Sequence, residues 1–267
     1  MSPRSGDHPA AAETVQACVE APIARLTLAR PQNRNALSAE LLDDLAAAAA
    51  RAAADTSVKV IVIAAQGPVF SSGHDLRELL AGGTPDHEAV FASCRRAMEG
   101  LRALPVPVIA EVDGLATAAG CQLVASCDLA VASDRAAFAT PGVRIGLFCS
   151  TPMVPLTAVI GPRRALEMLL TGEPVDAATA LSWGLVNRVV PVADLTSATD
   201  ALAAAIAASS REVVALGKRA FYAQVGRPEV DAYDITTPIM VDNASNDAAR
   251  EGIGAFLEKR PPRWPGG

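Results

Sequence analysis

The chain has 267 residues, of which 51% are hydrophobic and 19% charged, and this suffices to bury a sizeable core in one large globular unit. Its formal net charge of -6 and its lack of a long Lys/Arg block argue against a general affinity for nucleic acid. The first fourteen residues lack the apolar core of a signal peptide, and no apolar run approaches the ~20 residues that cross a bilayer. We therefore expect a flexible leader over residues 1–14 and a cytoplasmic protein without membrane insertion.

The segment after this leader predicts two strands and a helix. Residues 14–31 are expected to form two short strands divided at Ala21-Pro22, because apolar and β-branched residues alternate and proline interrupts a strand ladder. Ser38 is the expected N-cap of a helix that runs to about residue 55. Its alanines favour helix, and its leucines lie on one face.

The next segment alternates strands with helical crossovers. The continuous apolar runs 58–65 and 107–112 are typical of strands covered by helices on both faces. An interrupted helical crossover over 75–104 joins them, and a helix that opens near Gly120 leads to a further short strand over 129–133. Repetition of this unit indicates an α/β fold with a largely parallel sheet.

From about residue 151 the pattern becomes mainly helical. Asp176 is the expected N-cap of one helix and Gly184 its expected end. We therefore divide the chain into an α/β core over residues 15–190 and a helical region over residues 191–267.

Two stretches run from a strand through small residues into a helix: "QGPVFSSGHDLRELL" (66–80) and "DGLATAAGCQLVASCD" (113–128). Free N-H groups at such helix starts bind anionic atoms, and two of them at one oxygen form an oxyanion hole. Glycine-containing turns are common in α/β folds, so the spacing alone favours a purely structural role.

Other site motifs are missing from the sequence. It contains no G-x-G-x-x-G after a strand, no phosphate-binding G-x-x-x-x-G-K-[ST] and no G-x-S-x-G nucleophile elbow. Five cysteines and three histidines show no paired spacing for zinc, so we expect reduced thiols, no metal site and no cofactor.

The chain resembles the crotonase, or enoyl-CoA hydratase/isomerase, superfamily. The resemblance extends over residues 15–262 and combines several motifs in order, which makes it highly specific. These motifs are "RPQNRNALS", "GPVFSSGHDL", "VDGLATAAGCQLVASCDLAVAS", "FATPGVRIGLF", "TGEPVDAATALSWGLVNRVVP" and "EGIGAFLEKRPP". The resemblance implies a ClpP-like fold of repeated ββα units, a C-terminal helical trimerisation region, and a homotrimer or hexamer.

The resemblance also implies a coenzyme A thioester as substrate or ligand. The backbone N-H groups of His74 and Ala119 would hold the thioester oxygen, and Gly120 would permit close approach. The residues implied along the nucleotide and pantetheine are Asn33, Arg34, Ser72, Asp75 and Leu76. Lys259, with Met240 nearby, matches positions that reach the coenzyme A of a neighbouring subunit in relatives.

The sequence departs from the working hydratases at both catalytic glutamates. Gln122 stands at the first position and Gly142 at the second. An amide is not a useful base near neutral pH and glycine has no side chain, so we expect weak hydration of enoyl-CoA. We also expect the double change Gln122→Glu and Gly142→Glu to raise hydration, provided that the loop after Pro141 tolerates a side chain.

Several polar residues are candidates to replace the glutamates. His74 is the strongest by position, although a packing role or a contact with coenzyme A explains it at least as well. We interpret His87 as a solvated loop residue and Asp128 as a capping or hydrogen-bonding residue. Cys149 and Ser150 have no visible base beside them, which argues against a nucleophile.

Two hypotheses follow. The leading one is an acyl-CoA enzyme with an intact thioester-polarising site and altered proton chemistry. The alternative is a non-catalytic acyl-CoA-binding or regulatory protein. Both predict binding of coenzyme A thioesters, so turnover separates them.

Overall fold

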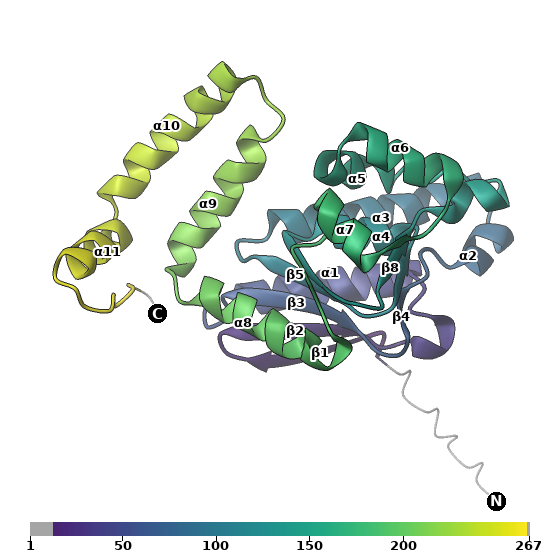
Figure 1. Cartoon of the computed structure of the whole chain (residues 1–267), viewed down its shortest axis with the longest axis horizontal. Helices are drawn as coiled ribbons and strands as arrows, with labels where there is room; N and C mark the ends of the chain where they lie inside the picture. Colours follow the sequence, from purple (N-terminus) through teal and green to yellow (C-terminus); the bar gives the residue numbers. More distant parts are fainter. Residues whose placement is uncertain (1–12, 266–267) are drawn as a thin grey trace, which may run out of the picture.

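The structure is a computed structural model, and it describes residues 13–265. Residues 1–12 of the expected leader lie outside this range. Figure 1 shows a sheet covered by helices, with the last three helices forming an arm beside this core.

A six-stranded sheet forms the base of the core, in the order β1-β2-β3-β5-β7-β10. β1 pairs antiparallel with β2, and the remaining pairs are parallel. The largely parallel sheet predicted from the sequence is confirmed. Its strands are β1 (Val15–Glu20), β2 (Ile23–Leu28), β3 (Val60–Ala65), β5 (Val108–Val112), β7 (Leu129–Ser133) and β10 (Arg188–Val190).

A second, four-stranded sheet has the order β4-β6-β8-β9. The residue pattern did not predict its strands, although the family resemblance implies repeated ββα units. β4, β6 and β8 each follow a long strand of the first sheet after a short turn, so the chain repeats a ββα unit. The strands are β4 (Val69–Ser71), β6 (Leu115–Thr117), β8 (Ala137–Ala139) and β9 (Val175–Asp176).

The helices begin and end largely where the sequence places their caps. The Ser38 side chain accepts a hydrogen bond from the Leu41 backbone at the start of α1, and Asp176 does the same for Thr179 at the start of α7. Gly184 ends α7 as predicted. The helices are α1 (Ala39–Ala54), α2 (Leu76–Ala81), α3 (Thr84–Ala103), α4 (Ala119–Ser126), α5 (Met153–Ile160), α6 (Pro162–Thr171), α7 (Ala177–Trp183), α8 (Leu195–Ala207), α9 (Arg211–Gln224), α10 (Glu229–Ser245) and α11 (Asp247–Leu257).

Strand β3 shows how the first sheet is buried on both faces. Ile61 and Ile63 pack in the main core, which also contains the buried leucines of α1. Val60 and Val62 point the other way and belong to a second cluster with Leu195 of α8. Helices thus cover both faces, which explains the unbroken apolar run of this strand.

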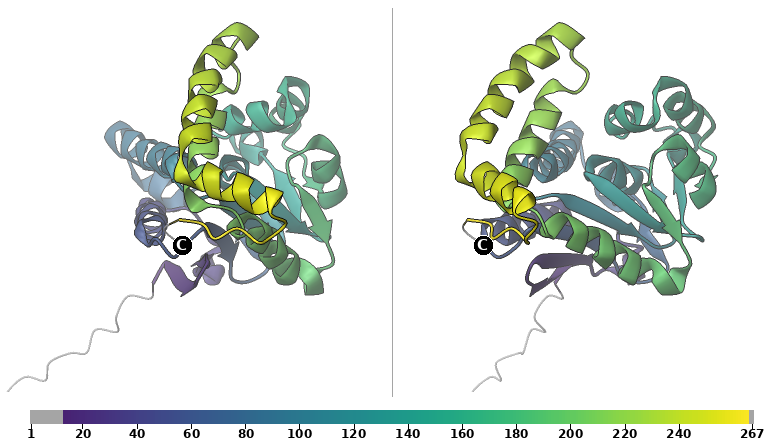
Figure 2. Two further views of the ribbon diagram at one scale, coloured as in Figure 1. Left: turned by 90° about the vertical axis from the view of Figure 1, so that its left-hand side faces the viewer. Right: turned by 60° about the vertical axis from the view of Figure 1, so that its left-hand side comes forward.

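The arm formed by α9, α10 and α11 projects from the core in all three views (Figures 1 and 2). Neither α9 nor α10 has a buried apolar residue, and large apolar side chains such as Phe221, Tyr233 and Phe256 are exposed. Helix α8 precedes the arm and packs against the sheet instead. The division at residue 190 and the oligomerising role of the region after it stay predictions.

Candidate active site

A cavity of about 660 Å³ lies beside the start of α4. Its walls come from the loop after β4, from α2 and α3, from the turn between β6 and α4, and from the segment after β8. Such a mainly apolar cavity suits a hydrocarbon chain with a few polar contacts. Its large apolar side chains are Leu76, Leu79, Phe91, Ile145, Leu147 and Phe148.

The two predicted amide donors meet at this cavity. His74 and Ala119 both line it. A Cβ atom on Gly73 would lie 3.2 Å from the Ala119 nitrogen, so the two segments are in direct contact. Within residues 13–265, neither the His74 nor the Ala119 backbone N-H donates to another protein group. The arrangement can therefore offer two backbone donors to one oxygen atom.

The turn into α4 has an unusual backbone at Ala118. This residue has φ of 50° and ψ of -118°, a conformation that is costly for a residue with a Cβ atom. Its N-H donates to the Ala139 carbonyl, and its own carbonyl accepts from the Gln122 N-H at 3.0 Å. These bonds hold the first turn of α4 at the cavity.

Gly120 lies behind the donors rather than in the cavity lining. A Cβ atom here would lie 2.5 Å from the Ser71 carbonyl oxygen, which leaves no room for a side chain. Gly120 thus lets α4 approach β4 closely. This close packing helps to set the position of the Ala119 N-H group.

Asn35 is a positioning residue that the sequence interpretation missed. It is fully buried, and its amide nitrogen donates to the carbonyls of Gln66 and Val69 at 2.9 and 2.8 Å. Its backbone carbonyl accepts from the Ser71 hydroxyl at 2.8 Å. The residue lies inside "RPQNRNALS", and a buried amide among loop residues is a signal that this motif alone does not reveal.

The His74 side chain also reaches the cavity. Its ring packs edge to face against Phe91, with 5.2 Å between ring centroids. Both ring nitrogens are buried without a hydrogen-bond partner among the described residues. Burial lowers the pKa of His74, and the nearby Leu37 backbone offsets only part of this effect. The ring is therefore neutral near pH 7.

Gln122 lies on α4 but not in the cavity lining. Its side-chain oxygen accepts a long contact of 3.8 Å from the buried Cys94 thiol on α3. Burial raises the pKa of Cys94 to about 11, so this thiol stays protonated. The amide is thus part of the α3–α4 packing, and it is not positioned to orient a water molecule in the cavity.

Gly142 does line the cavity, in the short 3-10 helix Pro141–Ile145. A Cβ atom on it would lie 2.4 Å from the Leu147 carbonyl oxygen and 2.9 Å from the Cys149 sulfur. The loop has closed over the place where a side chain would leave the backbone. The condition attached to the double change, that this loop tolerates a side chain, is therefore not met on steric grounds.

Five residues were predicted along the coenzyme A. Ser72 and Leu76 line the cavity, and Leu76 is 53% exposed. The Ser72 N-H donates to the Arg34 carbonyl at 3.0 Å, which brings the Asn33–Arg34 turn beside them. The Asp75 carboxylate caps α2 by accepting from the Arg77 N-H. Of the five, Ser72 and Leu76 thus line the cavity, whereas Asn33, Arg34 and Asp75 adjoin these two residues without lining it.

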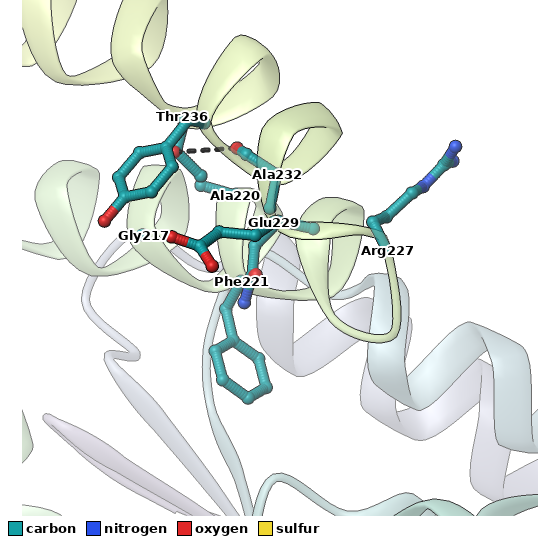
Figure 3. Close-up of a pocket in the computed structure, with 9 residues that line it drawn as sticks. Gly217, Ala220, Phe221, Arg227, Glu229, Ala232 and Thr236 are labelled. Carbon is teal, nitrogen blue, oxygen red and sulfur yellow. Dashed lines mark hydrogen bonds between the residues drawn. The ribbon is translucent and has the colours of Figure 1, made fainter.

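Met240 and Lys259 are on the arm and do not line the cavity. Both are exposed. A separate hollow of about 560 Å³ lies between α9 and α10, where Phe221 and Glu229 face it (Figure 3). Neither predicted residue lines this hollow. Within one described chain, Met240 and Lys259 thus remain apart from the site.

The remaining polar candidates have mostly structural contacts. The His87 ring bonds the Leu79 carbonyl at 2.8 Å, and Ser150 bonds the nearby Phe148 carbonyl. Asp128 accepts from the Val108 N-H, as its expected role in hydrogen bonding suggests. Burial raises the pKa of Cys149, which makes its thiol a poor nucleophile.

Among residues 13–265, no cluster of three or more metal-binding side chains occurs, and no helix is long and apolar enough to span a bilayer.

The sequence matches the family described as enoyl-CoA hydratase/isomerase over residues 19–267. The chain belongs to this family. Solved members share its fold: a crystal structure of human enoyl-CoA hydratase domain-containing protein 3 superposes with a TM-score of 0.92 at 50% identity, covering 94% of this chain and 100% of that one. An enoyl-CoA hydratase from Mycobacterium smegmatis gives 0.92 at 46% identity, covering 94% and 99%. The predicted crotonase fold is confirmed.

Within the family, "VFSSGHDL" and "ATAAGCQLVASCD" indicate a likeness to enoyl-CoA hydratase domain-containing protein 3. The comparison confirms it. The human protein of this name is 52% identical over 243 residues, which are 91% of this chain and 80% of that protein. The Xenopus laevis protein is 51% identical, with coverage of 91% and 83%.

The predicted cytoplasmic location is wrong. The similar proteins from Xenopus laevis, Homo sapiens and Mus musculus are named as mitochondrial. The prediction rested on the lack of an apolar signal-peptide core. Mitochondrial targeting segments are amphipathic and need no such core, so its absence could not distinguish the two compartments.

Proposed function

We propose that this family member binds acyl-CoA thioesters and polarises the thioester carbonyl, but hydrates enoyl-CoA only weakly. The observation that carries the proposal is the meeting of His74 and Ala119 at an apolar cavity whose two expected carboxylate positions hold Gln122 and Gly142. The two backbone N-H groups would bind the thioester oxygen and stabilise negative charge on it. The hydrocarbon chain would lie against the apolar wall.

The missing carboxylates limit the chemistry. Hydration requires a group that activates water and a group that handles the proton on the α-carbon. Gln122 faces Cys94, and Gly142 is closed in by Leu147. Lyase or isomerase chemistry of the family type therefore needs another proton acceptor in this chain.

The coenzyme A would lie over Ser72, Leu76 and the Asn33–Arg34 turn. This side of the cavity is where Leu76 is exposed and where the Ser72 backbone joins the turn. We further propose that the chain assembles as a homotrimer or hexamer through the arm, which would place Lys259 and Met240 of one subunit near the coenzyme A of another. The exposed apolar residues of the arm support an assembly role.

The second candidate is a non-catalytic acyl-CoA-binding protein. Two observations favour this candidate: position 142 has no room for a side chain, and the Gln122 side chain contacts Cys94 of α3. It differs from the first candidate in turnover alone.

The test is a panel of acyl- and enoyl-CoA thioesters incubated with the full chain and followed by mass spectrometry, with calorimetry for binding. The matching free fatty acids serve as controls, because the proposed contacts follow the coenzyme A and its thioester. Tight thioester binding with far weaker fatty-acid binding supports the proposal. Equal affinity for both contradicts it, and binding without any chemical change favours the second candidate.

A further inference from the structure

The His74 imidazole is a buried polar group whose nearest polar neighbour is the Leu37 backbone. Both ring nitrogens are shielded, and neither makes a well-aligned hydrogen bond with a described residue. The Phe91 ring fixes one edge of the imidazole at 5.2 Å between centroids. The side chain nevertheless lines the cavity, together with Ala118 and Ala119.

This arrangement is costly unless something enters the cavity. A buried donor or acceptor that is left unpaired loses its hydrogen bonds with water and gains none in return. A bound ligand can supply the missing partner, because His74 lines a cavity that is large enough for an acyl chain. The side chain starts at the residue whose backbone N-H is proposed to hold the thioester oxygen, and this residue lines the cavity that would receive the acyl chain.

The other ionisable groups of the cavity lining are poor proton acceptors. The Arg144 guanidinium is cationic and paired with Glu173. Burial raises the pKa of Cys149, which keeps it as a neutral thiol. Burial lowers the pKa of His74, so its ring is neutral. A neutral imidazole has one nitrogen lone pair that can accept a proton.

We propose that the His74 imidazole takes a proton from the α-carbon of a bound acyl-CoA, in the role that the absent carboxylates would have had. This inference rests on the proposed thioester site. In the step, the C-H bond breaks, the proton forms an N-H bond on His74, and the electron pair moves to the thioester oxygen as an enolate. The His74 and Ala119 N-H groups stabilise this oxyanion. Return of a proton to the carbon restores the acyl-CoA, so the balanced reaction is exchange of the α-hydrogen with water.

The experiment measures deuterium entry at the α-carbon of hexanoyl-CoA in D₂O, by NMR and mass spectrometry, with the full chain. A saturated thioester isolates proton abstraction from hydration. The variants are His74→Asn and His74→Gln, which keep the backbone N-H and a polar side chain but lack a base. The matched control is His87→Gln, because the His87 ring bonds the Leu79 carbonyl and lies outside the cavity lining. Circular dichroism and calorimetry with hexanoyl-CoA establish folding and binding for each protein.

The expected result is exchange by the wild type and His87→Gln, and a loss of at least about 100-fold in whichever His74 variant folds and binds. Binding by the wild type without exchange above that in buffer overturns the inference and leaves the proposed function standing. Exchange at the wild-type rate in a folded His74 variant overturns it equally. Absence of hexanoyl-CoA binding by the wild type overturns the proposed function and this inference with it.

Discussion

A side chain on Gly142 would place its Cβ atom 2.4 Å from the carbonyl oxygen of Leu147. The contact is with backbone, so a rotamer change cannot relieve it. The position that the family resemblance matches to a hydratase glutamate is therefore closed to a side chain in this chain. Restoring the residue type does not restore the site.

We expect Gly142→Glu to lower the free energy of unfolding by about 1–3 kcal/mol, as overpacking does, and to add no hydration activity, alone or with Gln122→Glu. Denaturant unfolding and loss of enoyl-thioester absorbance measure the two effects. The matched control is Gly100→Glu on α3, where a Cβ atom meets nothing within 4 Å. A well-folded double variant with a large gain in hydration would contradict the steric argument.

An ion pair between α9 and the core gives a second prediction. The Lys218 ammonium contacts the Asp128 carboxylate at 2.6 Å, with side chains that are 7% and 13% exposed. It also donates to the Val106 carbonyl, and the Tyr222 hydroxyl donates to Asp128. We expect Lys218→Met to cost about 3–5 kcal/mol, because it leaves a buried carboxylate without its cation. Thermal unfolding of Lys218→Met measures this loss of stability, and Lys259→Met at an exposed position is the control. The same unfolding temperature for the two variants would contradict a stabilising role of the Lys218–Asp128 pair.

The lowered pKa of His74 predicts a pH dependence of stability. Between that pKa and the usual value of about 6.5, the unfolded chain binds more protons at this residue than the folded chain does. Its contribution to the free energy of unfolding therefore falls as the pH drops below about 6.5. We expect His74→Phe to remove this part of the pH dependence and His87→Gln to keep it. Urea unfolding across this pH range tests it, and an unchanged profile in His74→Phe would refute it.

The proposed coenzyme A contact of Lys259 gives another prediction. An ammonium is a point-charge partner for phosphate, so Lys259→Ala should weaken coenzyme A binding more than dephospho-coenzyme A binding, by roughly fivefold. Lys259→Arg, which keeps the charge, is the control. Calorimetry on the assembled protein gives both affinities. The same loss for the two ligands would remove Lys259 from this role.

Much of the fold could be predicted because it depends on local signals. Ser38 and Asp176 cap their helices as expected, and the apolar run of β3 marks a strand buried on both faces. The second sheet escaped prediction because strands of two or three residues, such as Val69–Ser71, carry too little periodicity. The remaining features of the fold depend on tertiary contacts between segments that are distant in the sequence.

The candidate site, like the fold, could be predicted where it depends on local sequence motifs. The family motifs predict two backbone donors, His74 and Ala119, and the turns at Gly73 and Ala118 bring these two residues to one cavity. They could not show that Gln122 turns toward Cys94 or that Leu147 closes over Gly142, because each contact joins residues on different elements. The unpartnered His74 ring likewise becomes visible only when its surroundings are known.

The most direct test of the central claim is hydration of crotonyl-CoA by the wild-type chain, with calorimetric binding of the thioester measured on the same preparation. A family member that carries both glutamates, assayed under matched conditions, sets the reference. We predict clear binding and a turnover at least about 100-fold below the reference, because the thioester donors remain while the proton-handling carboxylates do not. Turnover within tenfold of the reference, or failure to bind the thioester, would contradict the account.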